Sequence, residues 1–363
     1  MKILELELEH FRNLSPGLFR PHEEVNVIWG DNAQGKTNLL EAVWLFTGGR
    51  SFRGARDGEL VALGQEEAAL RLSFYSQERQ QEARITLRGG RRSAVLNGVP
   101  KRGMAELVGS FCAVIFSPEH LSLVKGGPAE RRAFLDSALC QVKPPYASVF
   151  ARYQHTLSQR NALLKDIPRH PELMDTLSIW DERLCRYGEV MVRERGRYLE
   201  QFSQAAAEFY AGISGNREQL SLQYQPSHQG TLAEALAASR REDVRSGHTT
   251  AGPHRDDVAV SLSGLQARAF ASQGQQRSIV LAMKLAEARL LARACGEEPV
   301  VLLDDVLSEL DASRQDYLLN SLHGRQVFLT CCEPQAAARL KQGALFHVEG
   351  GGLQKEEKTC GGQ

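Results

Sequence analysis

A glycine-rich segment near the start of the chain has the residue types needed to hold a phosphate. Residues 30–37 read GDNAQGKT and fit the pattern GxxxxGK[ST], with an apolar stretch before and a helix-forming stretch after. Glycines let backbone N–H groups turn toward phosphate oxygens, and the following helix directs its positive end at them. The pattern predicts a nucleotide site made of Gly30, Asp31, Asn32, Ala33, Gln34, Gly35, Lys36 and Thr37, with Lys36 on the γ-phosphate and Thr37 on Mg²⁺.

Two adjacent carboxylates follow a continuous apolar run late in the chain. Residues 300–306 read VVLLDDV, and their apolar run is typical of a strand buried on both faces that ends in the carboxylates Asp304 and Asp305. Such a strand delivers its last residues to the edge of the sheet where open α/β folds bind ligands. We expect Asp304 to hold Mg²⁺ and Asp305 to polarise the attacking water. Two aspartates that merely form a turn are the alternative.

A third segment, Ser272-Gln273-Gly274-Gln275, has the spacing of a capping box at the start of a helix. A helix start that contains glycine also attracts anions. Both interpretations are compatible, so Ser272, Gly274 and Gln275 are candidate binding residues as well as a helix cap.

The elements that must position these residues indicate an α/β fold with a helical insertion. We expect a strand over Val25–Trp29 and a helix over Thr37–Phe46 near the first motif, and Asn97-Gly98 indicates a hairpin. The segment from about residue 118 to 246 is predicted to be helical. We therefore expect one discontinuous ATPase domain, 1–117 with 247–363, and a helical lobe, 118–246.

Two long helices in the insertion are predicted to form an antiparallel hairpin. One covers Tyr146–Lys165, and the other carries apolar residues at intervals typical of a coiled-coil seam from Trp180 to Phe209. A short projecting arm and a helical subdomain packed on itself remain equally open.

The order of these motifs resembles that of the ABC-type ATPases. GDNAQGKT, SQGQ, VVLLDDV and the segment SELD at residues 308–311 stand where that class has Walker A, signature, Walker B and D-loop. The opening ILELELEHFRNL resembles the SMC-like branch. TTAGPHRDD at 249–257, FSPE at 116–119 and KGGPAERRAFLD at 125–136 resemble the bacterial RecF family, and the resemblance covers essentially the whole chain.

The resemblance implies a DNA-binding ATPase of recombinational repair. In such a protein, Ser272, Gly274 and Gln275 would complete the nucleotide site of a second subunit, so that ATP drives formation of a homodimer. Arg12 and Asn13 would lie near the nucleotide, and Ser308 and Asp311 would belong to the D-loop. The family binds duplex DNA near single-strand gaps and works with RecO and RecR to help RecA displace single-strand binding protein.

Three positions depart from the wider class, and the first two of them predict slow ATP hydrolysis. Cys331 follows the last strand where a histidine is usual, Asp305 stands where glutamate is common, and residues 117–120 contain no glutamine for a Q-loop. An SMC-like clamp with a vestigial ATPase remains an alternative. A transporter ATPase predicts that histidine and a shorter span between motifs, and a small-molecule kinase predicts no signature motif.

Local cations are the candidates for DNA contact, since the whole chain has no net charge, with 44 basic and 44 acidic residues. The candidates form three groups, each of which could equally be ordinary solvated surface. They are Arg50, Arg53 and Arg56; Arg88, Arg91, Arg92, Lys101 and Arg102; and Arg193, Arg195 and Arg197. His254 and Arg255 are expected near the ATPase site or at a hinge between lobes.

The cysteine pattern and the hydropathy indicate the cellular compartment of the protein. Seven cysteines, with one adjacent pair and no CxxC, argue against a disulfide framework or a zinc site. No apolar run approaches the ~18 residues that a membrane span needs. We therefore expect a cytoplasmic protein without a membrane partner.

Overall fold

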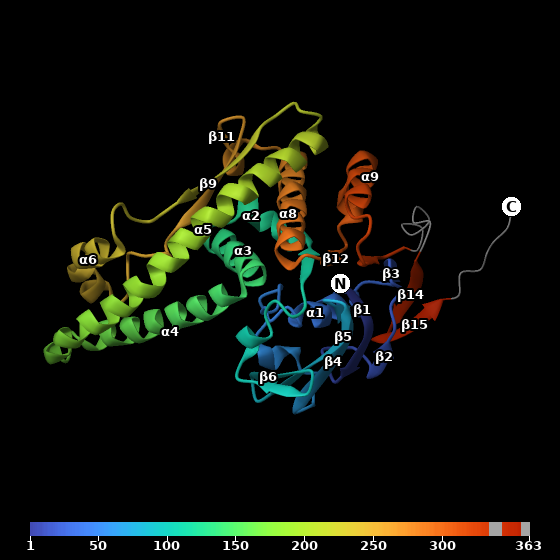
Figure 1. Cartoon of the computed structure of the whole chain (residues 1–363), viewed down its shortest axis with the longest axis horizontal. Helices are drawn as coiled ribbons and strands as arrows, with labels where there is room; N and C mark the ends of the chain where they lie inside the picture. Colours follow the sequence, from blue (N-terminus) through green and yellow to red (C-terminus); the bar gives the residue numbers. More distant parts are fainter. Residues whose placement is uncertain (334–342, 357–363) are drawn as a thin grey trace. The chain divides into compact units, whose positions relative to one another are not determined.

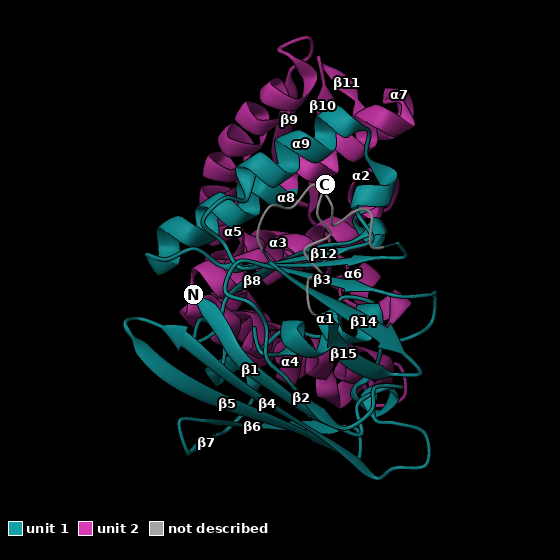
Figure 2. Cartoon of the chain, turned by 90° about the vertical axis from the view of Figure 1, so that its right-hand side faces the viewer, with its two compact units in different colours: residues 1–120, 284–363 teal, residues 121–283 magenta. Residues whose placement is uncertain are grey.

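The computed structural model describes residues 1–333 and 343–356. The chain forms two compact units, residues 1–120 with 284–363 and residues 121–283, which Figure 2 shows in different colours. The first unit begins and ends the chain, and the second is inserted into it.

A six-stranded sheet in the first unit carries the predicted nucleotide motifs. Its strand order is β15 (Gly352–Glu356), β14 (Ala344–Glu349), β3 (Val25–Trp29), β13 (Val327–Cys331), β12 (Val300–Asp304) and β8 (Ala113–Phe116). From β14 to β8 all neighbours pair in parallel, while β15 is antiparallel. The carboxyl ends of β3, β12 and β8 therefore meet at one edge of the sheet.

The first unit also contains a second sheet, which is antiparallel. Its order is β2 (Gly17–Phe19), β1 (Lys2–Glu9), β4 (Glu67–Ser76), β5 (Arg79–Arg88), β6 (Arg91–Leu96) and β7 (Val99–Lys101). Helix α1 (Lys36–Leu45) shares a core with both sheets, and Leu6, Leu40 and Phe328 are fully buried in it. Asn97 and Gly98 have positive φ and form the turn between β6 and β7.

The remaining elements of the first unit are short helices and turns, together with the part of helix α8 (Gln273–Cys295) from Lys284 onward. The short elements are η1 (Asp57–Leu60), η2 (Met104–Glu106), η5 (Leu307–Glu309) and α9 (Ala312–Ser321). The 3-10 turn η3 (Pro118–Leu121) leads into the second unit.

The second unit packs helices around a small sheet. Helices α4 (Pro144–Asp166) and α5 (Leu177–Ser214) run side by side (Figure 1) and bury Leu164, Ile167 and Leu177 where η4 (Pro171–Thr176) joins them. Helices α3 (Pro128–Val142) and α6 (Leu232–Ser246) pack against this pair. The hairpin is therefore part of a packed subdomain rather than a bare arm. Helices α2 (Ser122–Lys125) and α7 (Ala267–Phe270) are single turns.

One strand lies inside the segment that the sequence predicted to be helical. β9 (Leu220–Gln225) pairs with β10 (Asp257–Leu262), which also pairs with β11 (Leu265–Gln266). Because this pairing keeps residues 247–283 with the helices, the units divide at 120/121 and 283/284, whereas we expected boundaries at 117/118 and 246/247.

Among the described residues, no helix combines the length and apolar character of a membrane span.

Candidate nucleotide-binding site

The loop between β3 and α1 has a backbone that only glycine can adopt at two places. Gly30 has φ of 148°, and a Cβ there would lie 2.4 Å from the carbonyl oxygen of Val348. Gly35 has φ of 117°, and a Cβ there would lie 2.7 Å from Leu14. These close contacts explain why the two glycines of the motif stand at these positions.

Lys36 places its ammonium group inside the curve of this loop. Its side chain is largely buried, and Nζ donates to the carbonyl oxygens of Gly30 at 2.5 Å and Asp31 at 2.8 Å. Asn13 holds the loop from outside, because its amide donates to the Ala33 carbonyl oxygen at 3.0 Å. A cation surrounded by main-chain groups at a helix start is suited to a phosphate.

Thr37 and Asp304 meet although 267 residues separate them in sequence. The Thr37 hydroxyl donates to Asp304 Oδ1 at 2.8 Å, and the Thr330 hydroxyl donates to the same oxygen at 2.9 Å. Burial raises the pKa of Asp304, and the nearby carboxylates of Glu119 and Asp305 raise it further. A bound cation would relieve this accumulation of negative charge.

The residues at this point fit Mg²⁺ bound together with nucleotide phosphates. A hydroxyl and one carboxylate are the oxygen ligands that Mg²⁺ takes when phosphates supply the others. Among residues 1–333 and 343–356, no group of three or more His, Cys, Asp or Glu side chains is arranged to hold a metal. The expected ligands Thr37 and Asp304 therefore suit a cation that arrives with its nucleotide.

Asp305 lies next to this pair in a left-handed backbone conformation, with φ of 49°. Its N–H donates to the Thr330 hydroxyl at 2.9 Å, and the Ser308 hydroxyl donates to its Oδ1 at 3.0 Å. Non-glycine residues with positive φ are uncommon and concentrate at functional sites. Of the predicted D-loop pair, Ser308 contacts Asp305, while Asp311 caps α9 by accepting from the N–H of Arg314.

Two further residues, Cys332 and Glu119, lie at this edge of the sheet because each comes just after one of its parallel strands. Neither residue belongs to the Walker A, signature, Walker B or D-loop segment. Cys332, which comes after β13, has its Sγ 3.3 Å from Asn32 Oδ1 and 3.8 Å from Lys36 Nζ. Cys331, which stands where the wider class has a histidine, is buried and donates to the Glu333 carbonyl oxygen. Glu119 follows β8 and accepts from the Ser117 hydroxyl. Its position beyond an apolar strand was the signal that could have identified it.

Arg12 does not contact the phosphate loop. Its guanidinium bonds to both carboxylate oxygens of Glu41, at 2.9 and 3.1 Å, and to the Glu59 carbonyl oxygen. Because Glu41 is fully buried in α1, this pair fixes the segment after β1 onto that helix. Of the two residues expected near the nucleotide, only Asn13 contacts the loop.

The start of α8 forms the predicted capping box. The Gln275 N–H donates to the Ser272 hydroxyl at 3.3 Å, and the Ser272 N–H donates to Gln275 Oε1 at 2.6 Å. Gln275 also donates to Glu218 at 2.5 Å, which ties the cap to the loop before β9. The cap is confirmed, and Ser272 remains exposed.

The segment TTAGPHRDD makes its contacts inside the second unit. His254 bonds to the Tyr153 hydroxyl at 2.7 Å and to the Thr249 carbonyl oxygen at 3.0 Å. Asp256 accepts from the Ser227 N–H and from the Tyr224 hydroxyl. The segment therefore joins α4 to the β9–β10 region.

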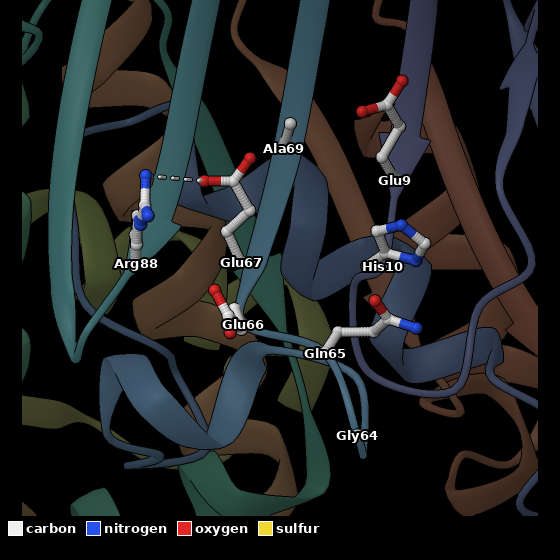
Figure 3. A pocket seen from close by; sticks show the side chains of 8 residues that line it. All are labelled: Glu9, His10, Gly64, Gln65, Glu66, Glu67, Ala69 and Arg88. Atoms are coloured by element: carbon white, nitrogen blue, oxygen red, sulfur yellow. Dashed lines mark ion pairs between the residues drawn. The ribbon is translucent and has the colours of Figure 1, made fainter.

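A separate cavity of about 440 Å³ lies at the ends of β1, β4 and β5 (Figure 3). Glu9, Glu66 and Glu67 line it with His10, and Arg88 pairs with Glu67 at 3.8 Å. Its excess of carboxylates makes it unsuited to phosphates.

The fold and the phosphate-loop site define an ABC-type ATPase head of the SMC-like branch. The family model described as "RecF/RecN/SMC N terminal domain" matches residues 2–348. The SMC head of Pyrococcus furiosus shares the fold, with a TM-score of 0.56 and 16% identity over 98% of this chain and 96% of that chain.

Within this class, the chain belongs to the RecF family. It is 41% identical to the DNA replication and repair protein RecF of Agathobacter rectalis, over 96% of this chain and 97% of the relative. A solved structure of the recombination mediator protein RecF with ATP, described as part of the RecFOR pathway, has a TM-score of 0.91 and 35% identity over 98% of both chains. The transporter alternative is therefore not supported, because the relatives that cover the whole chain are repair proteins.

Proposed function

We propose that this protein is an ATP-dependent DNA-binding repair ATPase that dimerises when ATP and Mg²⁺ are bound. The observation that carries the proposal is the contact between Thr37 and Asp304 beside the Lys36 loop, in a chain that resembles RecF over its full length. The RecF structure with ATP supports the choice of nucleotide.

Each residue of the site has a role in this proposal. Lys36 and the loop N–H groups bind the β- and γ-phosphates, and Thr37 and Asp304 would hold Mg²⁺, which would supply positive charge against the phosphates. Asp305 orients and polarises the attacking water, with its carboxylate held by Ser308. The short side chain of Asp305, and the presence of Cys331 where a histidine is usual, favour slow turnover.

The exposed cap of α8 is the surface through which a second copy acts. Ser272 and Gly274 lie at a helix N-terminus, where N–H groups and the helix dipole attract an anion. In the dimer these residues contact the γ-phosphate bound by the partner. Since ATP then forms part of the interface, its presence shifts the equilibrium toward the dimer.

The DNA-binding surface proposed for the first unit is a basic rim, defined as Arg50, Arg56, Arg91, Lys101 and Arg102. Residues 50–60 and 88–106 contain eight basic and three acidic residues. Arg92 joins the two segments, because it bonds to Asp57 at 3.0 Å and to the Gly49 carbonyl oxygen at 2.6 Å. The flanking cations of the rim remain available for DNA phosphates.

Two arginines that looked like DNA contacts have structural partners instead. Arg92 is largely buried in the joint just described. Arg195 is 1% exposed and bonds to both oxygens of Asp136, at 2.9 and 2.8 Å, and to the Pro253 carbonyl oxygen. Neither side chain can reach DNA, so binding depends on the rim.

The proposed partners are duplex DNA near single-strand gaps, a second copy of the chain, and RecO and RecR. The RecFOR pathway in which the solved relative is described supports the protein partners. A cytoplasmic location is part of the proposal.

The proposal is tested by measuring DNA binding and mass on the same samples. Fluorescence anisotropy of labelled duplex and gapped DNA, with light scattering, is recorded with and without ATP·Mg²⁺. We expect ATP to raise both the affinity for DNA and the mass to that of a dimer. Lys36→Ala should weaken ATP binding about 10- to 100-fold and abolish both effects, whereas Lys125→Ala, at an exposed cation outside the site, should retain them. ATP binding without either effect would overturn the proposal.

A further inference from the structure

Two cysteines far apart in sequence lie in contact in the first unit. Cys112 and Cys295 are 183 residues apart, and their sulfur atoms are 3.2 Å from each other. Cys112 comes directly before β8, and Cys295 is the last residue of α8. Gly296, with φ of 72°, then ends the helix, so the backbone on both sides of the pair is fixed by secondary structure.

The pair is not explained by metal binding or by the nucleotide site. Among the described residues, no third His, Cys, Asp or Glu side chain joins them in an arrangement that could hold a metal. Neither residue contacts Lys36, Thr37 or Asp304. Cys112 is buried, whereas Cys295 is half-buried and therefore within reach of a small reagent.

We propose that Cys112 and Cys295 are a redox modification site that closes to a reversible disulfide. The oxidant is a low-molecular-weight disulfide, and the reductant that reopens the bond is a low-molecular-weight thiol. This proposal does not depend on the proposed function.

The two thiols have different roles: Cys295 attacks the oxidant, and Cys112 then closes the disulfide. The hydrogen bond between the two sulfur atoms lowers the pKa of Cys295, while the same contact and burial raise the pKa of Cys112. Cys295 therefore reacts first, since the thiolate is the nucleophile and Cys295 is the less buried residue of the two. It attacks one sulfur of the oxidant, which leaves as a thiolate.

Cys112 then completes the reaction. Its sulfur, once deprotonated, attacks the sulfur of Cys295 in the mixed disulfide and displaces the second half of the oxidant as a thiol. In total, two protein thiols lose two electrons and two protons, and one small disulfide becomes two small thiols. No other reactant is needed.

The bond would enclose the whole inserted unit. Both chain connections to the second unit, at 120/121 and 283/284, lie between Cys112 and Cys295 in sequence. A disulfide would thus connect the start of β8 to the end of α8, two elements of the first unit that flank the insertion in sequence. Closing so long a loop restricts the unfolded chain strongly, so the oxidised protein should be the more stable form.

The test treats the reduced full-length protein with oxidised glutathione, blocks remaining thiols, and maps peptides by mass spectrometry without reduction. We expect a cross-linked 112–295 peptide that is about 2 Da lighter than its two reduced parts, and that dithiothreitol reverses. Cys112→Ala should stop the reaction at a Cys295–glutathione adduct, and Cys295→Ser should leave Cys112 unmodified. Cys140→Ser, which removes a thiol of the second unit, should not change the result.

A second measurement keeps the proposal testable if a variant at the buried Cys112 folds poorly. The melting temperature of the wild type should rise on oxidation and fall again on reduction, while that of Cys295→Ser should not respond. Absence of the 112–295 peptide at oxidant concentrations that fully modify Cys332 would overturn the proposal. A bond only between Cys331 and Cys332, or only between two chains, would overturn it as well.

Discussion

Asp305 combines a carboxylate with a backbone conformation that few residues adopt. Its positive φ turns the chain directly after β12, whose last residue is Asp304. Asn tolerates this conformation as well as Asp does. Asp305→Asn therefore removes the negative charge without forcing the turn to change.

For Asp305→Asn we expect ATP hydrolysis to fall by about 100-fold or more, since a general base contributes at least that much. ATP binding should remain close to that of the wild type, and the dimer should accumulate in ATP. Phosphate release, nucleotide binding and light scattering measure these three properties. Unchanged hydrolysis would show that another group activates the water, and Glu119 would be the next candidate.

At the scale of the elements, His254 connects helix α4 to the segment before β10. Burial lowers its pKa to about 4, and the charges of Arg255 and Arg132 contribute. Its unfolded pKa is about 6.5, so the unfolded chain binds a proton at pH values where the folded chain does not. The folded state has its full stability with respect to His254 above pH 6.5, where the imidazole is neutral in both states. Its free energy of unfolding decreases as the pH falls toward 4.

We therefore expect the wild type to lose about 3 kcal/mol of stability through this residue between pH 6.5 and 4. His254→Gln should be less stable than the wild type at pH 7, and its unfolding free energy should depend less on pH in this window. Urea unfolding at a series of pH values measures the difference. Identical pH slopes for both proteins would contradict the role of a buried neutral imidazole.

The start of α8 is the element that the proposed dimer requires. Ser272→Arg should leave ATP binding intact and prevent the ATP-dependent increase in mass. Loss of the cap alone costs about 1 kcal/mol. Thr231→Arg removes a matching capping box from α6 in the same unit and controls for that cost. If Thr231→Arg also fails to dimerise, or if Ser272→Arg dimerises normally, the interface lies elsewhere.

The sequence predicts the positions of motif residues well, but it does not predict which charged side chains are exposed. The phosphate loop and the aspartates after β12 could be placed because one buried strand and one glycine pattern determine their surroundings. Arg195 could not be placed, because a sequence does not distinguish a cation in solvent from one paired inside the protein. β9 was missed because six residues between two helical segments give a weak alternation, and their partner β10 lies more than thirty residues away.

At the scale of the whole molecule, DNA binding must come from a local surface, since the chain as a whole carries no net charge. If each cation of the basic rim contacts one phosphate, its removal lowers the slope of log K against log salt by about 0.9. A triple substitution of Arg50, Arg56 and Arg91 by Gln should reduce that slope by about 3 and weaken binding to all sequences alike. Arg241→Gln, an exposed cation on α6, is the control and should leave the slope unchanged. If the triple variant keeps the full salt dependence, DNA contacts a different surface, because counterions are released only where phosphates are neutralised.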